Sequence, residues 1–94
     1  MNMHYVELFD YYGDLFTDKQ KEYFIDYYFN NLTLQEIAEN NNISRNAVHK
    51  NIKDVTEKLD YYESKLNLYN NKKQIQKLIA SIDKNIKEQI EELI

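Results

Sequence analysis

Two helix-start signals stand close together in the middle of this 94-residue sequence. Thr33, followed three residues later by Glu36, matches a capping box, in which each side chain bonds the free backbone N–H of the other residue. Ser44 is a second N-cap candidate, and the asparagines at 40–42 tolerate the left-handed backbone that a tight turn requires. The stretch therefore predicts a helix, a turn and a second helix, over about 34–39 and from 45 to at least 62.

The rest of the chain is also predicted to be helical, because it contains no Pro and a single Gly, Gly13. Apolar residues at helical spacing predict a helix over about 4–12, and Gly13 is a plausible stop for it. A further capping box, Thr17 with Gln20, predicts a helix over about 18–29. The expected fold class is all-α, with a helix-turn-helix domain of about four helices in residues 1–69.

The last segment, residues 70–94, carries an apolar ladder after an Asn-rich break expected at 67–71. Its aliphatic residues recur every three or four positions, which predicts one long amphipathic helix. Such a helix has to pack its apolar face on the domain or on a second subunit, so we expect a homodimer. The ladder consists of Ile75, Ile79, Ile82, Ile86, Ile90 and Leu93.

Charge is distributed unevenly along a chain whose formal net charge is −4. Residues 1–69 hold seven Lys or Arg against twelve Asp or Glu, yet no acidic residue occurs between 40 and 53. Long donors near the start of the second motif helix can reach base edges and phosphates, and free N–H groups there favour an anion. The candidate nucleic-acid-binding residues are Ser44, Arg45, Asn46, His49, Lys50 and Lys53. The competing interpretation is a solvated helix face in a domain used for protein contact.

Aromatic residues are abundant in the N-terminal helices, and the whole chain has nine Tyr and four Phe. They could form a stacking surface for single-stranded bases. They fall at helical spacing, however, and no basic residue is interleaved on that stripe. We therefore predict that they form the core and a subunit interface.

Several function classes lack their sequence signals here. There is no Gly-rich phosphate loop and no nucleophile in a recognisable setting, so we expect no enzyme and no cofactor. His4 and His49 are isolated and Cys is absent, which argues against a metal site. No apolar run approaches the roughly 20 residues of a membrane span, and the N-terminus lacks a signal-peptide pattern. We expect a cytoplasmic protein with no membrane association.

With these residues laid out, the chain resembles the YlxM family of bacterial helix-turn-helix proteins associated with the signal recognition particle. The resemblance covers roughly residues 6–69. The Thr17/Gln20 segment followed by the motif also resembles region 4 of sigma factors. The matching residues are Leu8-Phe9-Asp10-Tyr11-Tyr12-Gly13, Leu15-Phe16-Thr17-Asp18-Lys19-Gln20, Tyr23-Phe24, Tyr27-Tyr28, Leu34, Glu36-Ile37-Ala38, Ile43-Ser44-Arg45, Ala47-Val48, Asn51-Ile52-Lys53, Tyr62-Glu63 and Lys65-Leu66.

The resemblance implies a cytoplasmic, all-helical and often dimeric protein that modulates the signal-recognition pathway. Its partner would be RNA or DNA of that pathway, or a protein component such as the particle's GTPase or the receptor. A sigma-like transcription regulator is a third possibility. Carried over position by position, the family's proposed nucleic-acid helix falls on the same six residues, from Ser44 to Lys53.

Overall fold

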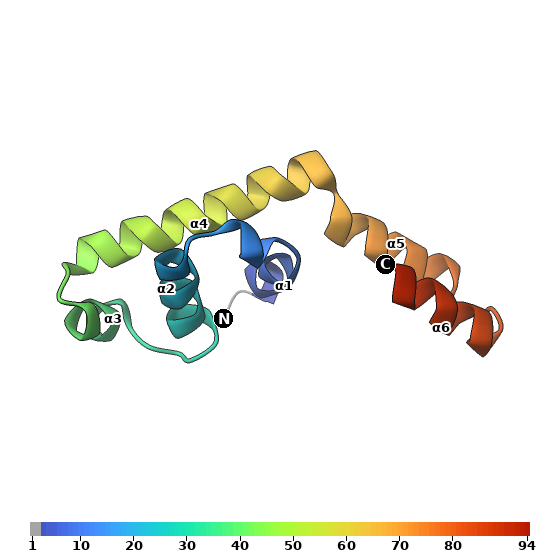
Figure 1. Cartoon of the computed structure of the whole chain (residues 1–94), viewed down its shortest axis with the longest axis horizontal. Coiled ribbons are helices and arrows are strands. Elements are labelled where there is room, and N and C mark those ends of the chain that lie inside the picture. Colours follow the sequence, from blue (N-terminus) through green and yellow to red (C-terminus); the bar gives the residue numbers. More distant parts are fainter. Residues whose placement is uncertain (1–2) are drawn as a thin grey trace.

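The computed structural model describes residues 3–94, and this part of the chain forms six α-helices, one short 3-10 helix and no strand. The molecule is elongated, about 53 × 25 × 20 Å. In Figure 1, α4 runs along one edge with α1, α2 and α3 on the same side of it, and α5 and α6 extend beyond its C-terminal end. The elements are α1 (Met3–Tyr12), η1 (Gly13–Leu15), α2 (Asp18–Tyr28), α3 (Leu34–Asn41), α4 (Arg45–Leu66), α5 (Leu68–Leu78) and α6 (Lys84–Leu93).

The 22-residue helix α4 is the element on which the others pack. Its buried residues fall in two groups, because its N-terminal half faces α2 and α3 while its C-terminal half faces α1 and α2. Both groups consist of apolar side chains, whose burial stabilises the fold by about 1.5–3 kcal/mol for each large residue. The first cluster is Leu8, Tyr12, Phe16, Phe24, Val55 and Leu59, and the second is Tyr23, Ile37, Ala38, Val48 and Ile52. The predicted aromatic core is therefore confirmed for Tyr12, Phe16, Tyr23 and Phe24.

The helix caps expected from the sequence are all formed. Thr17 and Thr33 each take part in a complete capping box. Ser44 Oγ accepts a hydrogen bond from the backbone N–H of Ala47 at 3.0 Å, which starts α4. The turn before it is confirmed at Asn42, whose φ of 55° is left-handed, although α3 extends to Asn41 and takes in most of the predicted Asn turn.

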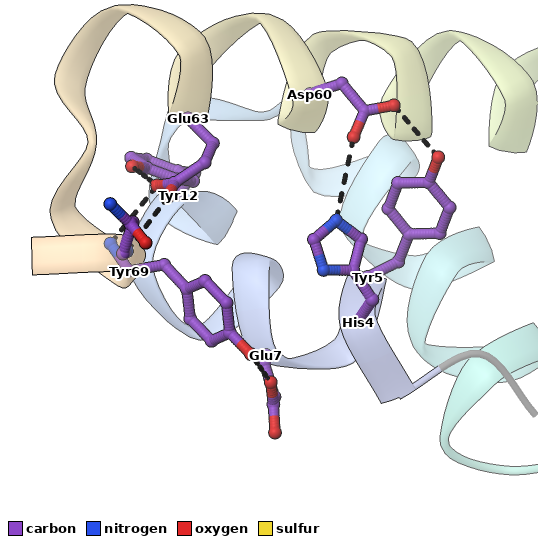
Figure 2. Close-up of polar contacts among 8 residues, drawn as sticks. His4, Tyr5, Glu7, Tyr12, Asp60, Glu63 and Tyr69 are labelled. Carbon is purple, nitrogen blue, oxygen red and sulfur yellow. Dashed lines mark hydrogen bonds and ion pairs between the residues drawn. The ribbon is translucent and has the colours of Figure 1, made fainter. Parts of the chain in front are cut away.

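The break predicted at 67–71 is wrong in extent, because the interruption between α4 and α5 is a single residue. Asn67 has a left-handed φ of 56° and joins α4 directly to α5. A new helix can start so abruptly only where its free N–H groups find acceptors. The carboxylate of Glu63 accepts hydrogen bonds from the backbone N–H groups of Tyr69 and Asn70 at 3.1 and 3.0 Å. Figure 2 shows Glu63, Tyr12 and the start of α5 at Tyr69 grouped at this junction.

The single long helix predicted over 70–94 is also wrong, because this segment forms two helices. α5 ends at Leu78, and Asp83 starts α6 by accepting hydrogen bonds from the N–H groups of Asn85 and Ile86 at 2.9 and 3.3 Å. The second helix folds back, so that its end shares a cavity of about 280 Å³ with the start of α5. Figure 1 shows α6 beside α5, with the C-terminus close to α5. Residues 68–94 thus form a helical hairpin, here called the C-terminal hairpin.

Polar contacts also tie α1 to the C-terminal half of α4 (Figure 2). Asp60 accepts a hydrogen bond from the Tyr5 hydroxyl at 2.9 Å and lies 3.9 Å from His4 Nε2. The Tyr69 hydroxyl donates to the carboxylate of Glu7, which joins α5 to α1. Two carboxylates in the C-terminal half of α4, Asp60 and Glu63, are therefore hydrogen-bonded to tyrosines of α1. No helix within residues 3–94 has both the length and the apolar composition needed to cross a bilayer.

Candidate nucleic-acid interface

The six predicted binding residues lie together at the start of α4, and all six are exposed. Ser44 precedes the helix and the other five occupy its first turns. Val48 and Ile52, which alternate with them, are buried and hold this part of α4 against α2 and α3. The arrangement gives a rigid, solvent-facing surface, which we call the α4 basic face: Ser44, Arg45, Asn46, His49, Lys50 and Lys53.

The positively charged residues of the α4 basic face differ in their partners. Lys50 Nζ lies 3.7 Å from Asp54, and Lys53 Nζ lies 3.9 Å from Glu57. Arg45 forms no ion pair with any residue in the described part of the chain, 3–94. Exposed ion pairs of this kind contribute only about 0–1 kcal/mol, so a phosphate can displace the carboxylates. Arg45 can bind a phosphate without first giving up a carboxylate partner.

A groove runs between α2 and α4 beside this face. Arg45 lines a cavity of about 610 Å³ together with Tyr27, Tyr28 and the segment 31–34. A second cavity of about 230 Å³ is lined by Tyr27, Tyr28, Leu34, His49, Ile52, Lys53 and Thr56. Because Tyr27, Tyr28 and Leu34 bound both cavities, the two adjoin, and we call them together the α2–α4 groove.

The two tyrosines of the groove play different parts. Tyr28 is half-buried and packs against both core clusters, while Tyr27 keeps 38% of its surface exposed. Their ring centroids lie 5.1 Å apart with the planes at 86°, an edge-to-face pair. Burial raises the pKa of Tyr28 above its usual value, and the neighbouring Tyr27 raises it further. Tyr27 therefore presents an aromatic ring to solvent that Tyr28 and the core hold in place.

Tyr27 was not among the residues predicted to bind, because the sequence placed it with the core. A signal was present in the pair Tyr27-Tyr28 itself. Consecutive helical residues point about 100° apart, so the two rings have different surroundings. The pairing of Tyr27 with Arg45 had no sequence signal, since it depends on how α2 packs against α4.

Within 3–94 no three or more His, Cys, Asp or Glu side chains gather closely enough to hold an ion.

Comparison with known proteins relates the whole chain to one family. The family model described as "UPF0122: Putative helix-turn-helix protein, YlxM / p13 like" matches residues 1–94. A UPF0122 protein of Malacoplasma penetrans is 48% identical over 86 residues, which cover 88% of this chain and 78% of that protein. A UPF0122 protein of Fusobacterium nucleatum is 43% identical over 88 residues, covering 93% and 85% respectively. A third, from Listeria welshimeri, is 42% identical over 76 residues, covering 81% and 69%.

Proposed function

Because this chain belongs to the UPF0122 family of YlxM-like helix-turn-helix proteins, we propose that it is a non-enzymatic regulatory protein that binds nucleic acid through the start of α4. The observation that carries the proposal is the exposed α4 basic face, which has no acidic residue from Arg45 to Lys53. Helices that follow such a turn commonly present their first residues to a groove of nucleic acid.

The target we propose is RNA or DNA of the signal-recognition pathway. Support for this pathway comes from the YlxM-type motifs of the chain rather than from any contact geometry. Two cations of the basic face are paired with acids, and the chain carries a net charge of −4. Both features predict binding that is weak for one copy and sensitive to salt.

The experiment compares binding of the signal recognition particle RNA and of a promoter duplex in a gel-shift assay at several salt concentrations. Replacing Arg45 and Lys50 together by Ala should weaken binding about tenfold or more and lower the salt slope by about one for each phosphate that is no longer neutralised. The matched control replaces Lys84 and Lys87 of α6 by Ala, since it removes the same charge from a distant helix.

Two results contradict the proposal. One is a wild-type protein that binds neither nucleic acid at low salt. The other is an equal loss of binding in the α6 control while its mass in sedimentation equilibrium stays that of the wild type, which would mean that net charge alone governs the interaction.

A protein-interaction module is the second candidate, and the ion pairs of Lys50 and Lys53 favour it because they leave the face partly neutral. Its partner would be the signal-recognition GTPase or its receptor. A pull-down in which the GTPase is retained after Arg45 and Lys50 are replaced supports this alternative. Preference for the promoter duplex over the RNA supports a sigma-like transcription regulator.

We also propose that the chain works as a homodimer. The C-terminal hairpin exposes several large apolar side chains, and we expect a second copy of the chain to cover them. A closed pair with two-fold symmetry would present two basic faces to one nucleic acid, which compensates for the few cations on each. The exposed residues are Leu68, Leu78, Ile82, Ile86 and Leu93.

A further inference from the structure

The α2–α4 groove combines an exposed aromatic ring with basic side chains, and this combination selects a particular ligand. We propose that the groove binds an unpaired nucleotide of single-stranded nucleic acid, with its base against Tyr27 and its phosphates near Arg45. The inference rests on the proposed function and deepens it, since it names the form of nucleic acid that the α4 basic face receives.

The charges around the groove point to an anionic ligand. The side chains that line its two cavities include Arg45, His49 and Lys53, and no Asp or Glu among the described residues lines either cavity. This is unusual for a chain that has 16 acidic residues against 12 Lys or Arg. A phosphate entering the groove meets cations and no lining carboxylate, so the groove complements a nucleic-acid backbone.

The aromatic wall points to a flat ligand. Tyr27 is 38% exposed, and its ring is buttressed by Tyr28, which packs into both core clusters. A ring that is fixed in place and open on one side is the platform on which unpaired bases stack. Leu34 and Ile52 add apolar surface, and the larger cavity, about 610 Å³, lies within the range of pockets that hold small ligands.

A single strand fits the groove better than a duplex does. The bases of a duplex are stacked on one another and offer only their edges in the grooves, so the Tyr27 ring cannot reach a base face there. On α4 the acids Asp54 and Glu57 follow directly behind Lys50 and Lys53, where they would face the phosphates of a duplex lying along the helix. A splayed strand instead can place its base in the groove and its phosphates beside Arg45, away from these acids.

The test measures fluorescence anisotropy of a labelled oligouridylate of about eight nucleotides and of an RNA hairpin duplex, with full-length protein. Tyr27→Leu should weaken binding of the single strand about five- to a hundredfold, the range typical for removal of one stacked base, and leave duplex binding unchanged. Tyr27→Phe keeps the ring and should bind within about twofold of wild type. The matched control is Tyr61→Leu, since Tyr61 is an exposed tyrosine (58%) that lines neither cavity.

Five outcomes of this experiment would contradict the proposed binding of an unpaired base at Tyr27. Tyr27→Leu that binds the single strand as tightly as wild type overturns the inference, as does an equal loss for strand and duplex. Duplex binding that depends on Arg45 but not on Tyr27 overturns the inference and leaves the proposed function standing, whereas a wild-type protein that binds neither nucleic acid overturns both. An acidic aromatic peptide that binds more tightly than the oligonucleotide, and only with Tyr27 present, overturns the inference in favour of a protein partner.

Discussion

The hydroxyl of Tyr12 donates a hydrogen bond of 2.6 Å to the carboxylate of Glu63, which links α1 to the end of α4 across 51 positions of sequence. The same hydroxyl accepts the backbone N–H of Leu68 at 3.2 Å. Together with the bonds from the N–H groups of Tyr69 and Asn70 to Glu63, this satisfies the first three free donors of α5. The start of the C-terminal hairpin is therefore held by two side chains, Tyr12 of α1 and Glu63 of α4.

Removing this hydroxyl should destabilise the protein. Tyr12 is only 1% exposed, and Tyr12→Phe leaves the Leu68 N–H without its acceptor and removes one of the two hydrogen bonds that Glu63 Oε1 accepts. Because one of these bonds involves a charged group, we expect the free energy of unfolding to fall by about 1.5–3 kcal/mol. Urea denaturation measures the change, and Tyr61→Phe, at an exposed tyrosine, serves as the control. Equal stability of the two variants would contradict the assigned role of Tyr12.

Stability should fall at alkaline pH. Burial raises the pKa of Tyr12 above its usual value of 10.0, and its hydrogen bond to Glu63 raises it further. The hydrogen bond to Asp60 does the same for the pKa of Tyr5. A pKa that is raised in the folded state means that folding strengthens proton binding, so this stabilisation is complete below about pH 10 and is lost as pH rises through the raised values. Urea titrations between pH 8 and pH 11 measure the loss, which should be smaller in Tyr12→Phe; an equal slope in both proteins would refute the assignment.

The ion pairs on α4 should restrain binding of nucleic acid. Asp54→Asn releases Lys50 and removes one negative charge beside the α4 basic face, so affinity should rise up to about fivefold at low salt. Glu88→Gln on α6 is the matched control, because Glu88 forms the same kind of exposed pair with Lys84. The two variants are compared in the same gel-shift assay. An identical gain in both would assign the effect to net charge and not to Lys50.

The homodimer proposal predicts a mass near twice the 11.4 kDa of one chain in sedimentation equilibrium at micromolar concentration. Leu78→Glu places a charge at a side chain that is 78% exposed on the C-terminal hairpin and should shift the protein to monomer. The control is Leu15→Glu, at an exposed leucine (58%) in η1, which should leave the mass unchanged. A wild-type protein that sediments as a monomer excludes the dimer. Dissociation by Leu15→Glu alone would move the interface to the N-terminal helices.

Local capping signals in the sequence correctly predicted the starts of α2, α3 and α4. Thr17, Thr33 and Ser44 cap helices because the capping bonds join residues only three positions apart, so a short segment contains all the information needed. The same is true of the left-handed turn at Asn42, whose side chain tolerates that conformation.

Two kinds of feature were not predicted correctly: a helix break inside a continuous apolar periodicity, and contacts between residues that are distant in the sequence. The isoleucine spacing of the last segment continues from α5 into α6 without a change of period, so periodicity alone could not reveal the break before Asp83. The start of α5 directly after Asn67 depends in part on Tyr12, which lies 56 positions before Leu68 and outside any local window. The α2–α4 groove was missed for the same reason, because only the packed fold brings Tyr27 near Arg45.

α4 begins at the basic face and ends where the C-terminal hairpin starts, so one unbroken helix connects the two surfaces proposed for nucleic acid and for dimerisation. At about 1.5 Å per residue its 22 residues span roughly 33 Å, and no Pro or Gly interrupts them. In the proposed dimer joined through the hairpins, α4 would hold each basic face at a set distance from the hairpin of its own chain. Such a pair would select nucleic acids by the spacing between their two contact points as well as by the chemistry at each.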